Sequence, residues 1–322
     1  MQCFQHLETS DPRDKINGFR GLHTKGLPLP RPNYQDNSTR QFFEEMEVWL
    51  LENTNNLVTL ALDLDDCSMK LPSWTPSFSS TSYPIEQNYY RHRLRLYMAY
   101  VCDLDLEEQL GPGKGFDYRR PGRLCMKGVQ IDEVASVAPD KLTFLPAADH
   151  INLLKRWFVF ATGREPLSND DAPFNNDAYC ATVLGGHVLD ATGSSGWRKA
   201  SASDYVHWQQ AVLESEHGPL TDPYHKLLMA SHVSAALQRR LFKTKRGSIA
   251  IGHPNVQPGD VLWVFKNGNA AFVTRKVPGP EQPSNMSEQW YTLQGHCYHH
   301  GLMQGGFDIA EATIDQHECI LV

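Results

Sequence analysis

The stretch that decides the fold reads DVLWVFK at 260–266, NGN at 267–269 and AAFVTRK at 270–276. Both outer segments are rich in β-branched and aromatic residues, which favour strands. The Asn-Gly pair between them is a hairpin signal, because both central residues of a two-residue turn need positive φ. Two further β-rich segments, 247–252 and 289–300, lie on either side of this pair. The pattern predicts an antiparallel sheet near the C-terminus.

Upstream of this region the sequence is mainly helical. Apolar residues recur at helical spacing after the candidate cap Ser38 and again over 147–162. Asp222-Pro223 is typical of a helix N-terminus. We expect further helices at 91–106, 203–214 and 222–242, and one strand at 123–132.

These elements predict a single composite domain over 1–322, of the α+β class. We expect a mainly helical part at 1–243 and an antiparallel β part at 244–322. In this arrangement, helices pack on a small antiparallel sheet or a partly closed β-barrel near the C-terminus.

The composition excludes several classes of protein. Hydrophobic residues make up 41% of the 322 residues and charged residues 21%, which indicates a folded chain. The formal net charge of -7 argues against a nucleic-acid partner. No apolar run approaches the ~20 residues that cross a membrane. The N-terminus lacks a secretory signal, and the seven scattered cysteines are typical of reduced thiols, so we expect a cytoplasmic protein.

Several segments carry a resemblance to a known family. Two of them are QRRLFKTKRG at 238–247 and GHCYHHGLM at 295–303, and between them lie QPGDV at 257–261 and FVTR at 272–275. In order and spacing they resemble the C-terminal region of fungal heterokaryon-incompatibility (HET) domain proteins. Upstream, DPRDKI, which begins at Asp11, and LPSWTP, which begins at Leu71, are similar to the same family.

The resemblance also has gaps. HET proteins usually begin with a longer, TIR-like half upstream of the DPRD segment, whereas Met1 lies ten residues before Asp11. The resemblance therefore implies the downstream module alone, without the half to which cell-death signalling is attributed. Where the family usually has Glu, Val and Glu, this chain has His296, His299 and Gly306.

The histidines of the last motif are the candidate site. On a strand, His296, Tyr298 and His300 share one face, while Cys297 and His299 point to the other. Imidazole and phenol groups offer hydrogen bonds without a fixed charge, so the first three are candidate catalytic donors in a pocket. The alternative is that they are surface or hydrogen-bonded sheet residues.

Three more residues are candidates for substrate binding. The guanidinium of Arg240 is well shaped to hold a carboxylate. Trp263 and Trp74 are either core residues or part of the lining of an apolar pocket.

Other chemistries have weaker signals. No cofactor motif is recognisable, and no second Cys/His pair stands at zinc-site spacing, so we expect neither cofactor nor metal. Cys180, His187 and Asp190 could form a covalent hydrolase only if the fold brings them together, because catalytic triads are recognised by geometry.

Two functions remain open. The first is a cofactor-independent cyclase or isomerase of fungal secondary metabolism, for instance an intramolecular Diels-Alder cyclase, acting on a hydrophobic small molecule. The second is a non-catalytic regulator or interaction module of the heterokaryon-incompatibility, programmed cell death type. A cavity of about 300 Å³ or more with converging polar groups favours the enzyme. An exposed apolar patch of several hundred Å² favours the regulator.

Overall fold

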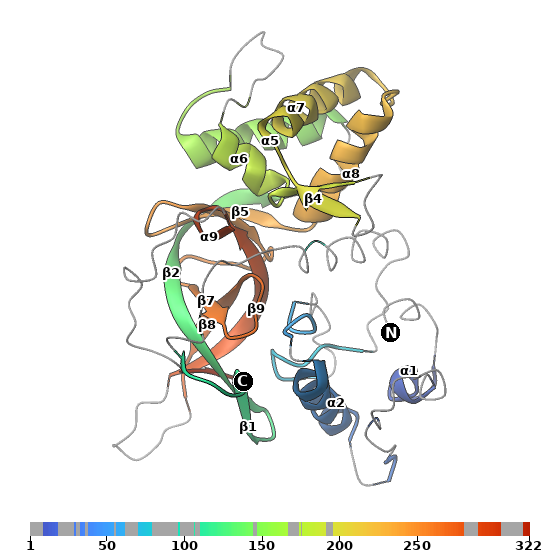
Figure 1. The fold of residues 1–322 in the computed structure, drawn as a ribbon, viewed down its shortest axis with the longest axis vertical. Coiled ribbons are helices and arrows are strands. Elements are labelled where there is room, and N and C mark those ends of the chain that lie inside the picture. The colour runs from blue at the N-terminus through green and yellow to red at the C-terminus, as the bar shows by residue number, and fades with distance from the viewer. Residues whose placement is uncertain are drawn as a thin grey trace.

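The computed structural model describes residues 9–18, 29, 33–35, 38–54, 56–61, 70–78, 96, 106, 110–143, 147–166, 174, 176–190, 196–279, 289–303 and 318–322. Within these ranges the chain has the predicted α+β fold. A large, mainly antiparallel sheet forms the centre, and helices α5 to α8 form a layer over one end of it (Figure 1). Helix α2 lies beside the sheet, away from that layer (Figure 1).

The described helices are α1 (Asp14–Asn17), α2 (Thr39–Thr54), α5 (Ala147–Thr162), α6 (Asp177–Val183), α7 (Ala202–His217), α8 (Pro223–Ala236) and α9 (His300–Met303). Polar caps fix several of their starts. The Ser38 hydroxyl accepts a hydrogen bond from the Gln41 backbone N–H before α2, and Ser201 forms a capping box at the start of α7. The helix expected at 91–106 lies outside the described residues, apart from 96 and 106. No described helix has the length and hydropathy needed to cross a membrane.

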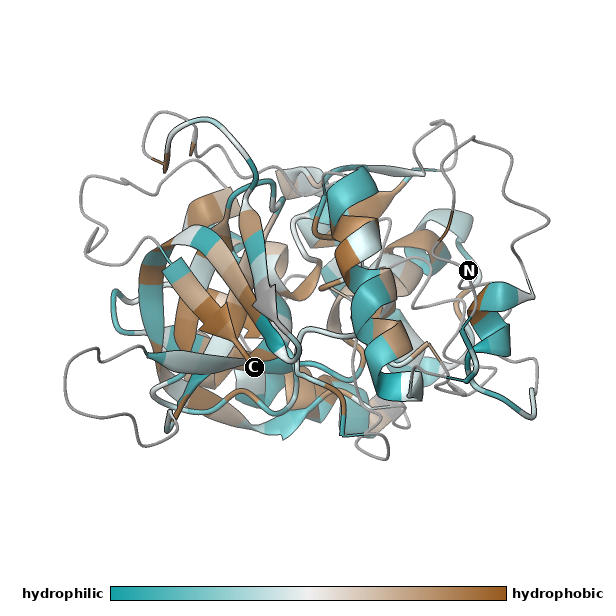
Figure 2. Cartoon of the chain, turned by 90° about the horizontal axis from the view of Figure 1, so that it is seen from below, coloured by the Kyte–Doolittle hydropathy of each residue, from teal (hydrophilic) through white to brown (hydrophobic). Residues whose placement is uncertain are grey.

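The strands are β1 (Phe116–Arg120), β2 (Arg123–Lys141), β3 (His187–Leu189), β4 (Trp197–Lys199), β5 (Arg240–Thr244), β6 (Ile249–Gly252), β7 (Val261–Phe265), β8 (Ala271–Val277), β9 (Trp290–His299) and β10 (Glu318–Leu321). Strands β3 and β4 form a separate small sheet. Hydrophobic residues concentrate on the strands of the large sheet (Figure 2), which places the main core there.

Two long strands close the large sheet into a ring-like arrangement. The first part of β2, 128–133, pairs with β7, and its second part, 134–141, pairs with β5. Strand β9 pairs with β8 up to Cys297 and then with β6 through Tyr298 and His299. The path β2-β5-β6-β9-β8-β7 therefore returns to β2. At the other end, β10 pairs with both β2 and β9.

Two local predictions are wrong. The helix expected at 222–242 ends at Ala236, and Gln238 has a positive φ of 54°. Strand β5 follows in place of the last helical residues, because its pairing with β2 and β6 overrides the helical pattern of that segment. The connection between β7 and β8 is also longer than a two-residue turn. It spans 266–270, and of its Asn-Gly pair Asn267 alone has positive φ, at 67°.

Three of the family-like motifs hold the sheet together. In LPSWTP, the Ser73 hydroxyl accepts a hydrogen bond from the Leu293 backbone N–H at 2.8 Å and donates to the Val322 carbonyl at 2.6 Å. This segment is thereby fixed to β9 and to the end of β10. Between β7 and β8, the Arg275 guanidinium contacts both carboxylate oxygens of Asp260, at 2.8 and 2.9 Å.

A buried pair of histidines joins α5 to α8. Nδ1 of His232 donates to the Val183 carbonyl at 2.9 Å, so its Nε2 accepts a hydrogen bond from Nε2 of His150 at 3.0 Å. Burial, together with the neighbouring His150, lowers the pKa of His232 to about 3. Burial also lowers the pKa of His150 to about 4. Both rings are therefore neutral in the folded protein at pH 7.

This pair predicts an acid-sensitive helical layer. The pKa of each folded imidazole lies below its unfolded value of 6.5, so the unfolded chain binds more protons as the pH falls toward 4. The free energy of unfolding should fall by about 1.4 kcal/mol per pH unit for each imidazole in this window. Urea denaturation between pH 7 and pH 4.5 measures the slope.

The matched control is the double variant His150→Gln, His232→Asn, which keeps an amide nitrogen near each bonded position but cannot titrate. Its slope should be shallower than that of the unmodified protein. Equal slopes for the two proteins would show that the pair is not linked to stability.

Candidate functional site

A cavity of about 410 Å³ lies between the helical layer and the sheet. One wall comes from the end of α5 and the start of α6, and the other from the β5–β6 turn and the start of α9. The lining residues are Ala161, Thr162, Arg164, Asn176, Ala178, Gly247, Ser248, Ile249, His300 and Gly301. The volume falls within the range of small-molecule sites, about 300 to 1,000 Å³.

His300 is the candidate catalytic residue that lines this cavity. Strand β9 ends at His299 and α9 begins at His300, so the imidazole sits where the chain turns from the sheet toward the helices. The ring is half-buried. Its Nδ1 atom is buried and has no hydrogen-bond partner among the described residues. A buried polar atom without a partner is uncommon, because no hydrogen bond offsets the cost of removing it from water.

The surroundings of His300 keep it neutral. Burial lowers its pKa from the ordinary 6.5, and the neighbouring His299 lowers it further. The carboxylate of Asp177, in the first turn of α6, acts in the opposite direction without reversing the shift. At pH 7 the ring therefore has one nitrogen that donates a hydrogen bond and one that accepts.

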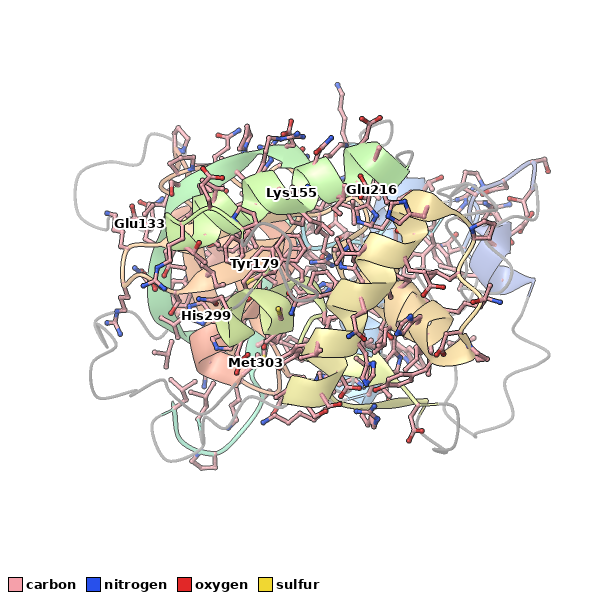
Figure 3. The ribbon with its side chains drawn as sticks, turned by 90° about the horizontal axis from the view of Figure 1, so that it is seen from above. Glu133, Lys155, Tyr179, Glu216, His299 and Met303 are labelled. Atoms are coloured by element: carbon pink, nitrogen blue, oxygen red, sulfur yellow. The ribbon has the colours of Figure 1, made fainter. Side chains whose placement is uncertain are left out.

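Below the cavity, His299 and Asp132 form a buried contact. Figure 3 shows His299 and Met303 beside α6, the helix that carries Tyr179. Nδ1 of His299 accepts a hydrogen bond from the Leu302 backbone N–H at 3.1 Å, so the neutral ring carries its proton on Nε2. Nε2 faces the Asp132 carboxylate, with 3.9 Å between Nε2 and Oδ2.

Asp132 also binds the β5–β6 turn, which belongs to the same wall of the cavity as α9. Its Oδ1 accepts hydrogen bonds from the backbone N–H groups of Glu133, at 2.8 Å, and Arg246, at 3.4 Å. Burial tends to raise the pKa of Asp132, but His299, Thr244 and the Glu133 N–H stabilise the carboxylate and leave the pKa below its ordinary value. The carboxylate thus connects α9 with the β5–β6 turn.

The other two candidate catalytic residues lie in the interior. His296 is 2% exposed, and the Arg239 guanidinium donates to its carbonyl at 2.8 Å and to its Nε2 at 2.9 Å. Because a guanidinium only donates, that Nε2 is an acceptor and the ring is neutral. Tyr298 is 1% exposed and packs against Gly186, where an added Cβ would lie 2.8 Å from Cε2 of the tyrosine. Neither side chain lines the cavity.

The candidate substrate-binding residues also lie away from the cavity. Trp263 is fully buried, with its ring centroid 5.8 Å from that of Tyr291, and Trp74 is fully buried against Tyr118. Arg240 is half-buried at the start of β5, and its Nε has no hydrogen-bond partner in the described part of the chain. These positions give the two tryptophans a role in core packing.

The hydrolase and metal alternatives find little support. Burial raises the pKa of the Cys180 thiol to about 12, and Sγ contacts the Phe174 carbonyl at 3.3 Å, so it is not an activated nucleophile. Nδ1 of His187 donates to the Gly185 carbonyl instead. Across the described ranges, no group of three or more His, Cys, Asp or Glu residues is arranged to hold a metal ion.

The remaining lining residues were not predicted from the sequence. Arg164, Asn176 and Ser248 belong to three separate segments, and none stands in a motif that points to binding. Only their convergence in space identifies them.

The family comparison agrees with the motifs. Residues 194–321 match the family model of the Het-6 beta-barrel domain, a C-terminal region of HET-family proteins. The match covers less than half of the chain and includes the sheet-side wall of the cavity, but the wall from α5 and α6 lies upstream of it. No curated protein and no solved structure gives a significant match.

The packing of Tyr298 generates a prediction. Gly186 has φ +68°, and its Cβ would meet the tyrosine ring, so Gly186→Ala should cost about 2 kcal/mol or more in unfolding free energy. Gly111→Ala is the matched control, because φ there is +70° and no atom lies within 4 Å of the added Cβ.

Urea denaturation of both variants measures the difference. Gly111→Ala should show only the backbone cost of about 1 kcal/mol. Adding Tyr298→Leu to Gly186→Ala should recover part of the loss. Equal costs at the two glycines would mean that the tyrosine contact contributes nothing.

Proposed function

We propose that this protein binds a small carbonyl compound in the cavity and rearranges it by proton transfer, as a cofactor-independent isomerase or cyclase. The observation that supports this proposal is the half-buried, neutral imidazole of His300, which lines a cavity of about 410 Å³. A half-buried imidazole with a lowered pKa, whose Nδ1 has no hydrogen-bond partner among the described groups, is typical of acid-base sites.

The proposed reaction requires no redox step. Nε2 of His300 removes a proton from the carbon next to the carbonyl, and the electron pair moves onto the carbonyl oxygen. A hydroxyl or amide donor such as Ser248 or Asn176 stabilises that oxygen. The imidazolium then returns the proton to a different carbon, which shifts the double bond. In a cyclisation, the same donors polarise the carbonyl of a folded substrate.

The cavity also has room for an apolar body. Ala161, Ala178 and Ile249 contribute apolar surface between the polar groups. We propose a hydrophobic small molecule as the substrate, in a cytoplasmic protein of secondary metabolism. The described cysteines are buried thiols, which fits a reducing compartment.

The test uses a simple β,γ-unsaturated ketone. The full chain is mixed with 3-cyclohexen-1-one, and conjugation to 2-cyclohexen-1-one is followed by ultraviolet absorbance. His300→Gln should lower the catalysed rate by about 100-fold or more, the usual contribution of a positioned acid-base residue. His217→Gln, which removes an exposed histidine at the end of α7, is the control and should leave the rate unchanged.

The pH dependence has a defined sign. A protonated imidazole cannot accept a proton, and the pKa of His300 lies below 6.5. The rate should be constant between about pH 7 and 8 and fall only below pH 6.5. No acceleration over buffer with the unmodified protein, or equal rates for the two His variants, would contradict the proposal.

A second candidate is a non-catalytic regulator or interaction module of the heterokaryon-incompatibility type, which binds a partner or ligand without converting it. The match of residues 194–321 to the Het-6 beta-barrel domain is consistent with a HET-family origin and does not distinguish the two candidates. In the described part of the surface, the exposed large hydrophobic residues are Tyr34 and Val206, so an apolar protein-binding patch has little support there. Saturable binding of the ketone that depends on His300, with no conversion, would support the regulator.

A further inference from the structure

The polar groups of the cavity are mainly donors. Asn176 uses its carbonyl oxygen to accept the Tyr179 backbone N–H at 2.8 Å, so its NH₂ group is the end that remains for a ligand. The Ser248 hydroxyl and the His300 ring supply two further donors. Thr162 already donates to the Phe158 carbonyl at 2.8 Å. A ligand that fits this lining must therefore present acceptors.

One cation stands among these donors. Arg164 lines the cavity and is exposed to solvent, and its guanidinium takes part in no ion pair among the residues that the structure describes. Among the described residues that line the cavity, none is an Asp or Glu. Asp177 is close enough to affect His300, but it is exposed and forms no described ion pair with Arg164. In the described part of the cavity walls, no carboxylate pairs with this positive charge.

We infer that the ligand carries a carboxylate that pairs with Arg164 while its carbonyl group lies against His300. A planar guanidinium binds a carboxylate through two parallel hydrogen bonds, and a single cation balances a single negative charge. This inference rests on the proposed function and names its substrate class: a small carboxylic acid with an apolar body and a second carbonyl. Arg164 is then the residue that determines specificity.

The experiment compares two probes of nearly equal shape. Binding of 4-(trifluoromethyl)cinnamate and of its neutral amide to the full chain is measured by fluorine NMR. The carboxylate should bind about two- to fivefold more tightly than the amide, the usual size of a solvent-exposed ion pair. Arg164→Gln should remove that difference, and Arg164→Lys should retain part of it.

The matched control is Lys155→Gln. Lys155 is exposed on α5 and does not line the cavity, so this variant loses the same charge at a different place (Figure 3). It should keep the preference for the carboxylate. Loss of the preference in both variants would indicate a general charge effect and overturn the role of Arg164.

Equal affinity for the two probes in the unmodified protein, or no binding of either, would also overturn the inference. These outcomes would not contradict the proposed function. The isomerisation of 3-cyclohexen-1-one tests that function separately, because this ketone is neutral and depends on His300 without a carboxylate. Circular dichroism of each variant confirms that the fold is intact.

Discussion

The buried contact between Asp132 and His299 joins β2 and β9, the two strands that close the large sheet into its ring-like arrangement. Asp132 lies on β2 just before that strand exchanges β7 for β5, and His299 lies on β9 just after that strand exchanges β8 for β6. At each exchange the backbone has to bend while its hydrogen bonds pass from one partner to another. The Asp132 carboxylate faces the His299 imidazole between these two bends, with 3.9 Å between Oδ2 and Nε2 in the protein interior.

The same contact positions the candidate site. Because Nδ1 of His299 binds the Leu302 N–H, the first turn of α9 is held at the end of β9, and His300 is turned toward the helices. Because Asp132 also binds the Arg246 N–H, the β5–β6 turn that carries Ser248 is held to the same carboxylate. The geometry of the sheet-side wall therefore follows from the way in which β2 and β9 close the sheet. Asp132 and His299, which set that geometry, are buried and do not line the cavity.

The sequence predicted the elements whose signals are local. Helix α5 has the predicted bounds of 147 and 162, and β7 and β8 lie where the β-branched and aromatic residues indicated. Prediction failed where pairing between segments distant in sequence decides the secondary structure. Examples are strand β5, which replaces the end of an expected helix, and the second half of β2. In the candidate site, His300 belongs to a recognisable motif. Arg164 and Asn176 reach the cavity only because α5 and α6 pack against the sheet, and such packing leaves no fixed spacing in the sequence.

The two walls of the cavity have different origins along the chain. The β5–β6 turn and α9 lie within the Het-6 beta-barrel match, whereas the ends of α5 and α6 precede it. The residues of the helical wall take no part in the strand pairings of the large sheet. A change at the ends of α5 and α6 would therefore alter the chemistry of one wall while the opposite wall keeps the geometry that the strands give it.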